Sequence, residues 1–328
     1  MRPFPTRGGR RPRAPRRPQF APSGDPLSLN LPSPKLLGAP RCLWAAGATL
    51  GEGTLWSPSE QALYWVDILG CTLYRYTPAS GAQAQWQFEE EISSLAERLH
   101  APGLTVTLRS GFAHFDPASG ALTRLHDPEP DQPGNRFNDG KCDALGRYWA
   151  GTMDFGATRP TGALYRFTAD GRCDRMDTGY AVSNGPTWSA DGRTLFFNDT
   201  VHQRVNAFDF DLASGGISNK RPSLQLAPGD GYPDGMTTDA AGRLWICHWG
   251  GACVTCHDPD SAAELARVEL PTAHITNVAF GGEDLRTLFI TSARYELSAE
   301  QLAAQPLAGS LFAVELDSPG TVAHRFAG

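Results

Sequence analysis

Residues 138–149 read NDGKCDALGRYW, and the same pattern returns as NGPTWSADGRTLF at 184–196 and as DGMTTDAAGRLW at 234–245. In each copy an Asn or Asp stands eight positions before a glycine, and an arginine follows that glycine. A polar residue followed closely by glycine, a short strand, a turn glycine and a second strand are typical of a β-hairpin with a tight turn. The three stretches therefore predict three hairpins that are built alike.

Weaker copies of this pattern extend it towards both ends of the chain, beginning at Glu52 and at Asn277. Successive copies from Asn138 to Asn277 begin 46, 50 and 43 residues apart. The 86 residues between Glu52 and Asn138 make two such periods. A further copy is therefore expected near Ser93–Ser94, followed by a strand at 104–108.

Six units with a period in the forties and about four short strands each indicate an all-β fold, the six-bladed β-propeller with four-stranded blades. The strand around Leu43–Leu50 is expected to complete the last blade beside Ser310–Leu316 and so close the ring. The tryptophans that recur with the period are expected in the blade core. A β-sandwich or barrel is the alternative, but neither explains the regular period.

The first forty residues differ from the rest of the chain. They hold eight basic residues, one acidic residue and ten of the 26 prolines. This composition predicts a disordered tail at residues 1–41, followed by one propeller domain at 42–328. Arg10-Arg11 resembles a twin-arginine signal, but prolines rather than an apolar segment follow it. The tail is therefore expected to be a solvated extension or the result of a misassigned start codon. Contact of the basic tail with nucleic acid or an anionic surface is the alternative.

The composition also limits the partners and the compartment. Beyond residue 40 the chain carries 21 basic and 34 acidic side chains, which argues against nucleic acid as a partner. It contains no run of eighteen apolar residues, which argues against a membrane span. Its seven cysteines are scattered, as in proteins of a reducing compartment. We therefore expect a cytoplasmic protein, either a monomer or a weak homo-oligomer.

Equivalent polar residues of the repeat predict a shared site. In a propeller the innermost strands meet at the axis, so these residues should gather at one mouth of the channel. They are Glu52, Asn138, Asn184, Asp234 and Asn277. One such residue alone would be expected to cap its own turn, but several in register favour a common polar site.

Carboxylate and amide oxygens are hard ligands that suit Ca²⁺, Mg²⁺ or Mn²⁺, whereas Zn²⁺ or Fe²⁺ is less expected without nitrogen or sulfur ligands. A cation held by few protein ligands can polarise a carbonyl group and acidify water. The predicted set therefore suits hydrolysis of an ester-like bond.

Several motifs resemble the SMP-30/gluconolactonase/L-arabinolactonase family over roughly residues 48–328. They are LGEGTLW at 50–56, YWVDI at 64–68, NRFNDGK at 135–141, GTM at 151–153, SNG at 183–185 and PDGM at 233–236. The resemblance implies a six-bladed propeller that hydrolyses sugar lactones with one divalent metal ion. The order and spacing of the motifs match, which makes the resemblance specific.

The same resemblance assigns roles to individual residues. It implies that Glu52, Asn184 and Asp234 bind the metal, that Asp234 is also the acid/base, and that Arg136 and Asn138 contact the substrate. Some relatives carry a substrate-binding Glu in the loop after the Gly-Thr-Met motif. Here residues 154–162 read DFGATRPTG, without a Glu, so the sugar is less defined than the reaction.

The predicted function is metal-dependent hydrolysis of a sugar lactone to the aldonic acid, with gluconolactone, arabinonolactone and xylonolactone as the candidate substrates. An organophosphate or aryl-ester hydrolase on the same scaffold is an alternative, because a metal would polarise a phosphoryl oxygen equally well. A third alternative is a propeller that only binds other proteins, and this predicts no metal site.

A cysteine-rich stretch suggests two other functions. Residues 253–257 read CVTCH, which is the attachment motif of c-type haem. On a strand, however, residues three apart face opposite sides, so both thiols could not easily reach one porphyrin. A zinc site formed with Cys247 and His248 fails for the same reason. The stretch is therefore expected to be an ordinary strand of the fifth blade.

Overall fold

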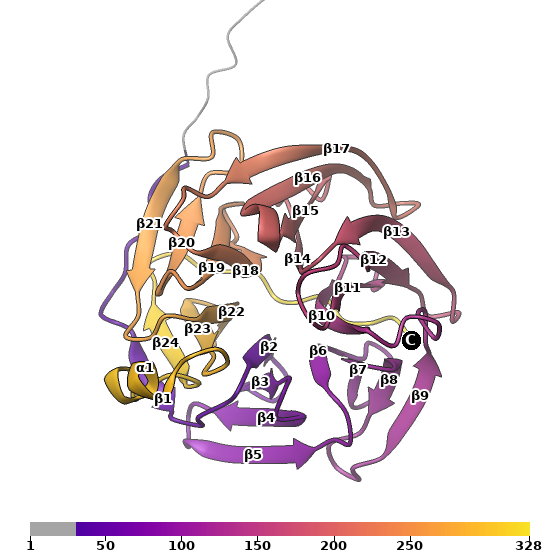
Figure 1. Cartoon of the computed structure of the whole chain (residues 1–328), viewed down its shortest axis with the longest axis horizontal. Helices are drawn as coiled ribbons and strands as arrows, with labels where there is room; N and C mark the ends of the chain where they lie inside the picture. Colours follow the sequence, from indigo (N-terminus) through magenta and orange to yellow (C-terminus); the bar gives the residue numbers. More distant parts are fainter. Residues whose placement is uncertain (1–30) are drawn as a thin grey trace, which may run out of the picture. The chain divides into compact units, whose positions relative to one another are not determined.

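Six antiparallel sheets of four strands each surround a central axis in the computed structural model, which describes residues 31–328 (Figure 1). The predicted six-bladed propeller is confirmed. Most of the predicted N-terminal tail, residues 1–30, lies outside the described residues. Among residues 31–328, no helix has the length and apolar character needed to cross a membrane.

Each blade begins with an inner strand at the channel and ends with a strand at the rim (Figure 1). From the channel outwards, the strands are β2 (Gly51–Ser57), β3 (Ala62–Asp67), β4 (Thr72–Thr77) and β5 (Ala82–Gln87) in blade 1; β6 (Ile92–Glu97), β7 (Leu104–Leu108), β8 (Gly111–Phe115) and β9 (Leu122–His126) in blade 2; β10 (Asn135–Cys142), β11 (Tyr148–Asp154), β12 (Gly162–Phe167) and β13 (Cys173–Tyr180) in blade 3; β14 (Ser183–Trp188), β15 (Thr194–Asp199), β16 (Arg204–Asp211) and β17 (Gly216–Gln225) in blade 4; β18 (Tyr232–Thr238), β19 (Leu244–Trp249), β20 (Cys253–His257) and β21 (Glu264–Glu269) in blade 5; and β22 (Ile275–Gly281), β23 (Thr287–Ser292), β24 (Leu311–Glu315) and β1 (Arg41–Trp44) in blade 6.

The second blade, whose sequence repeat is the weakest, lies where the period places it. Its first strand β6 contains Ser93 and Ser94, and its second strand β7 covers the predicted strand at 104–108. A short helix, α1 (Ala299–Ala304), and a 3₁₀ turn at Thr200–His202 are the helical elements within residues 31–328.

Blade 6 joins the two ends of the described chain. Strand β1 pairs with β24, so that Arg41 lies opposite Ala313 and Cys42 opposite Phe312. The closing strand was expected around Leu43–Leu50. It lies slightly earlier, because the chain bends inwards after Trp44 to reach β2. Residues before β1 also pack on this blade, since Leu36 forms a bridge with Leu316.

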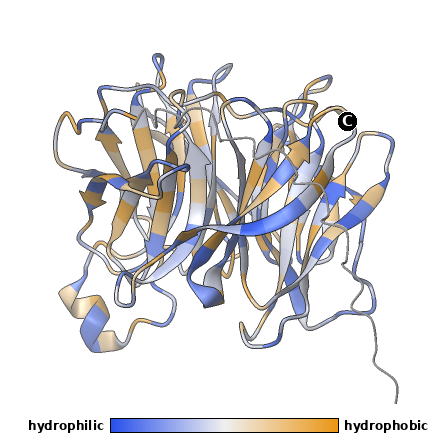
Figure 2. Ribbon diagram, turned by 90° about the horizontal axis from the view of Figure 1, so that it is seen from above, coloured by the Kyte–Doolittle hydropathy of each residue, from blue (hydrophilic) through white to orange (hydrophobic). Residues whose placement is uncertain are grey.

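Hydrophobic side chains from neighbouring blades fill the space between the sheets. The second strands of blades 1, 3 and 5 carry Trp65, Trp149 and Trp245, and all three side chains are fully buried. The rim strands are mostly exposed, as expected of strands with only one neighbour. Figure 2 accordingly shows hydrophobic residues concentrated in the strands that stand side by side around the axis. The prediction that the periodic tryptophans form the blade core is confirmed for Trp56, Trp149 and Trp245, which are buried. Trp188 is half-buried and packs at the edge of the cluster formed by blades 3 and 4.

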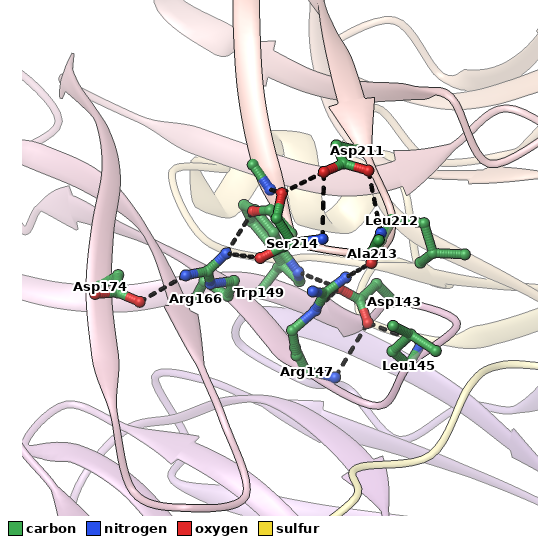
Figure 3. A network of polar contacts seen from close by, with 12 residues as sticks. Asp143, Leu145, Arg147, Trp149, Arg166, Asp174, Asp211, Leu212, Ala213 and Ser214 are labelled. Carbon is green, nitrogen blue, oxygen red and sulfur yellow. Dashed lines mark hydrogen bonds and ion pairs between the residues drawn. The ribbon is translucent and has the colours of Figure 1, made fainter.

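The turn of the repeated hairpin is held by a buried aspartate. In blade 3, Asp143 accepts hydrogen bonds from Arg147 Nε at 2.7 Å and from Trp149 Nε1 at 2.8 Å, as Figure 3 shows. In blade 5, Asp239 binds Arg243 and Trp245 in the same way. The spacing of Asp, Gly, Arg and Trp in the sequence is therefore the signature of this turn.

The C-terminal segment crosses the channel (Figure 1). It contacts the hairpin turns, since Ala327 N–H donates to the carbonyl oxygen of Gly146 and Ala240 N–H donates to that of Pro319. It forms single bridges with three blades, pairing Gly320 with Asp239, His324 with Cys142 and Phe326 with Arg98. A cavity of about 320 Å³ lies beneath it, lined by residues of all six blades. The segment thereby covers one end of the channel, and the other end stays open.

Candidate functional site

Four inner strands bring the residues singled out in the sequence to one cavity of about 200 Å³. Glu52 comes from β2, Arg136 and Asn138 from β10, Asn184 from β14 and Asp234 from β18. Each of these residues is at most 7% exposed. The five side chains thus meet although up to 182 residues separate them in the sequence.

A β-bulge lies at or directly after Glu52, Asn138, Asn184 and Asp234, the equivalent residues of the repeat. The pairing shifts between residues 52 and 55 in β2, between 137 and 140 in β10, between 184 and 187 in β14, and between 233 and 236 in β18. Bulges bend a strand and redirect its side chains. Gly53 and Gly185 adopt φ values of +56° and +82°, a region that favours glycine. Gly53 and Gly185 therefore allow the bend that turns Glu52 and Asn184 into the channel, whereas Asn138 is followed by Asp139 and only then by Gly140.

A line of hydrogen bonds holds one side of the cavity. Arg136 Nη1 donates to Asn138 Oδ1 at 2.7 Å, and Asn138 Nδ2 donates to Asn184 Oδ1 at 2.8 Å. Asn184 Nδ2 in turn donates to Thr200 Oγ1 at 3.0 Å. Each donor fixes the orientation of the next amide, so the two amide oxygens and the guanidinium are held in place before any ligand arrives.

Negative charge gathers on the opposite side. Burial, together with the charge of Asp139, raises the pKa of Glu52 to about 8. Burial also raises the pKa of Asp234 well above its ordinary value, and the charge of Glu52 adds to the effect. The nearby Arg136 guanidinium lowers both pKa values, but it does not offset the burial. The two carboxylates therefore lack a sufficient positive charge from the protein itself.

This donor set fits a divalent cation with oxygen ligands. Glu52, Asp234 and Asn184 offer two carboxylates and one amide oxygen around one cavity. Within residues 31–328, no group of three His, Cys, Asp or Glu side chains could hold a metal ion, so an amide oxygen would complete this donor set. A cation would supply the charge that the two buried carboxylates lack.

The outer part of the cavity is largely apolar, and the sequence repeat did not predict it. Val201, Tyr232 and Tyr295 line it and are all more than 40% exposed. Ala157, from the loop that lacks a Glu, and the half-buried Trp249 also line the cavity. Val201 and Tyr295 lie outside the strands of the repeated hairpins. Tyr232 precedes Asp234 by two residues, as Arg136 precedes Asn138, so the period marks its position but not its residue type.

Asn277, the residue of blade 6 that was expected in the same ring, does not line this cavity. It is fully buried beside Thr54, whose hydroxyl donates to Asn277 Oδ1 at 2.7 Å. The inner strand of blade 6 therefore contributes to the support of the site and not to its surface.

The cysteine-rich stretch is strand β20, as expected. Arg267 donates a hydrogen bond to Cys253 Sγ, whereas Cys256 packs in the hydrophobic core between blades 5 and 6. His248 and His257 both contact the hydroxyl of Thr255. The two thiols thus have different surroundings, and the two imidazoles share the Thr255 hydroxyl.

Known proteins resemble this chain over most of its length. The 6-deoxy-6-sulfogluconolactonase of Pseudomonas putida is 38% identical over 289 residues, covering 88% of this chain and 98% of that protein. The L-arabinolactonase of Azospirillum brasilense is 38% identical over 283 residues, covering 85% and 93%. A solved structure of regucalcin, a calcium-binding protein of Agrobacterium tumefaciens, is 29% identical with a TM-score of 0.85, covering 88% and 98%.

The family itself is recognised over residues 50–294, which span the first five blades and part of the sixth. This match and the two relatives at 38% identity agree with the motifs quoted from the sequence. The chain belongs to the SMP-30/Gluconolactonase/LRE-like family.

Proposed function

We propose that this protein hydrolyses a sugar lactone to the aldonic acid with the help of one divalent cation. The observation that carries the proposal is that the buried carboxylates of Glu52 and Asp234 line the same small cavity as Arg136 and Asn138. Two relatives that cover most of the chain are named as lactonases of sugar acids, which supports this class of substrate.

Glu52, Asn184 and Asp234 would hold the cation. When bound, it would polarise the lactone carbonyl and lower the pKa of water. The name of the calcium-binding regucalcin supports a divalent cation such as Ca²⁺, and Mg²⁺ or Mn²⁺ suits the same oxygen ligands.

Asp234 is the proposed acid and base. Its carboxylate takes a proton from the water whose oxygen attacks the carbonyl carbon of the lactone. The bond between that carbon and the ring oxygen then breaks, and Asp234 returns the proton to the ring oxygen as it becomes a hydroxyl group.

Arg136 and Asn138 are proposed to orient the substrate. One nitrogen of Arg136 is engaged by Asn138 Oδ1 and by the carbonyl oxygen of Phe137, and the guanidinium lines the cavity. Its other nitrogens can donate to sugar hydroxyls. Asn138 accepts a hydrogen bond from Arg136 and donates one to Asn184. It therefore links the proposed substrate contacts to a proposed metal ligand.

The test is removal and return of the metal during turnover of a panel of sugar γ- and δ-lactones. The purified protein is expected to hold about one divalent ion per chain, to lose activity with a chelator and to regain it with the ion, since metal affinity depends on these ligands. Full activity after verified removal of the metal would refute the proposed mechanism. A protein that binds no metal and hydrolyses no lactone would favour a propeller with a binding function only.

A further inference from the structure

We propose that Asn277 is a positioning residue that sets the separation of Glu52 and Asp234 by bridging the inner strands of blades 1 and 5. Asn277 belongs to β22, the inner strand of blade 6, which packs against both β18 and β2. The inference rests on the proposed function, because Glu52 and Asp234 are the two acidic ligands proposed there.

On the side of blade 1, Asn277 holds the strand that carries Glu52. Its Oδ1 accepts a hydrogen bond from Thr54 Oγ1 at 2.7 Å, and the backbone N–H of Thr54 lies at 3.4 Å from the same oxygen. Thr54 follows Glu52 by two residues, within the bulge that turns Glu52 into the channel. The contact is therefore placed where a small shift of β2 would move the carboxylate.

On the side of blade 5, Asn277 packs directly against the residue that follows Asp234. A Cβ atom on Gly235 would lie only 2.4 Å from Asn277 Nδ2 and 2.7 Å from its Cγ. Such a distance is not tolerated, so the glycine of the Pro-Asp-Gly motif leaves room for this amide. The side chain thus fills the space between the two strands that carry the acidic residues.

The free end of the amide faces negative charge. Asn277 Nδ2 is buried and forms no hydrogen bond of normal geometry with residues 31–328. The Asn277 amide lies close enough to the carboxylates of Glu52 and Asp139 to favour their ionised forms. A buried N–H group without a partner is costly, typically by about 1–3 kcal/mol, unless it faces an acceptor. Its orientation towards two carboxylates is consistent with a supporting contact for Glu52.

Asn277 is not itself placed to bind a ligand. It does not line the cavity that holds the other four equivalent residues, and its only oxygen is occupied by Thr54. The repeat puts the same kind of residue at the same position in several blades, but this one acts through its neighbours.

The test is the variant Asn277→Leu, which keeps a similar volume and removes both polar atoms. The readout is the dissociation constant for Mn²⁺ measured by calorimetry on the metal-free protein. We expect binding to weaken by roughly 10–100-fold, as is typical when a residue that supports a metal ligand is replaced. Lactone turnover should fall at low Mn²⁺ and recover with excess Mn²⁺, which a general loss of folding would not produce.

The matched control is Asn206→Leu. Asn206 is equally buried and also has an unpaired Nδ2 among the described residues, but it lies on β16, outside the channel. The Asn206→Leu variant should have a lower melting temperature and an unchanged affinity for Mn²⁺. Equal weakening in both variants would show that loss of stability, and not position, controls the affinity.

A second variant, Thr54→Val, removes only the hydroxyl group that holds Asn277 and should weaken Mn²⁺ binding in the same direction, by a smaller factor. If Asn277→Leu does not fold, this variant decides the question. Unchanged Mn²⁺ affinity in the folded variants would overturn the inference while the proposed function stands. A wild-type protein that binds no divalent cation would instead refute the proposed function on which the inference depends.

Discussion

Asp234 places a negative charge at a position where blades 3 and 4 carry the neutral amides of Asn138 and Asn184. All three side chains line the same cavity from equivalent positions of their blades, so the fold alone does not explain why one of them is charged. A carboxylate buried beside a second carboxylate, Glu52, is unfavourable for folding. Such an arrangement is common at functional sites, where an unusual pKa serves the chemistry.

The variant Asp234→Asn tests this charge. The amide keeps an oxygen that can bind a cation, but it loses the negative charge and cannot accept the proton. Lactone turnover should therefore fall by about 10²-fold or more. Turnover, metal content and melting temperature are measured together, with Asp230→Asn as a control that removes one charge four residues earlier. A folded Asp234→Asn protein with near-native turnover would remove Asp234 from the mechanism.

His274 makes the stability dependent on pH. Its ring stacks on Trp249 at a centroid distance of 3.9 Å, and burial lowers its pKa from 6.5 to about 4. Between these two pH values the unfolded chain binds a proton that the folded protein does not, so the free energy of unfolding decreases as the pH falls. The contribution is fully present above pH 6.5.

Accordingly, His274→Phe, which keeps an aromatic ring against Trp249, should lose less stability than the wild type between pH 7 and pH 5. Urea midpoints at the two pH values measure the difference. The control is His100→Phe, because the His100 side chain is exposed. Equal loss in the wild type and in His274→Phe would show that this imidazole does not control the acid sensitivity.

At the scale of the element, the hairpin turn combines a charge pair with an indole hydrogen bond. In blade 5 the pair is Asp239 and Arg243, which are 0% and 2% exposed. Blade 4 carries Ser189 at the position of Asp239, and there the following Arg193 is exposed. The aspartate is thus present where the arginine is buried.

The variant Asp239→Ser gives blade 5 the residue of blade 4. It leaves the Arg243 guanidinium buried without its carboxylate, and removing one partner of a buried pair typically costs about 3–5 kcal/mol. We expect a large drop in the free energy of unfolding, measured by chemical denaturation. Ser189→Ala should change it little, because Ser189 serves only its own turn. Similar small effects of both variants would show that the turn does not depend on the ion pair.

At the scale of the molecule, the two ends of the described chain hold the ring together. Strand β1 completes blade 6, and the C-terminal segment crosses the channel. Phe326 is 1% exposed and stacks on Phe167 at 5.6 Å, within the core shared by blades 2 and 3. The C-terminal segment therefore adds hydrophobic contacts between blades 2 and 3, whose inner strands β6 and β10 already pack against each other.

Phe326→Ala tests this contribution. Truncation of a buried phenylalanine typically costs about 3–5 kcal/mol. The expected result is a matching loss in the free energy of unfolding, with the lactone site unchanged because it lies at the other end of the channel. Val322→Ala on the same segment is the control, since Val322 is 48% exposed. If both variants unfold at the same denaturant concentration, the segment does not stabilise the ring.

The sequence by itself determined the number of blades and the gathering of Glu52, Asn138, Asn184 and Asp234. Both follow from a repeat that is local, because each copy forms its own hairpin and its own bulge, and a closed ring then turns equal positions towards one axis. The sequence also predicted that an N-terminal strand completes the last blade. It placed this strand around Leu43–Leu50, whereas β1 spans Arg41–Trp44, because the ends of short strands are poorly defined by sequence.

Only the tertiary structure decided which side chains surround these residues. In the cavity wall, Val201 comes from a 3₁₀ turn and Tyr295 from a loop, both outside the strands of the repeat, and Tyr232 stands at a repeated position whose residue type varies between blades. The place of Asn277 depends on contacts with the two neighbouring blades, and the path of the C-terminal segment depends on three blades at once. Contacts between units that are distant in the chain leave no regular spacing in the sequence, and they become visible only when the ring has closed.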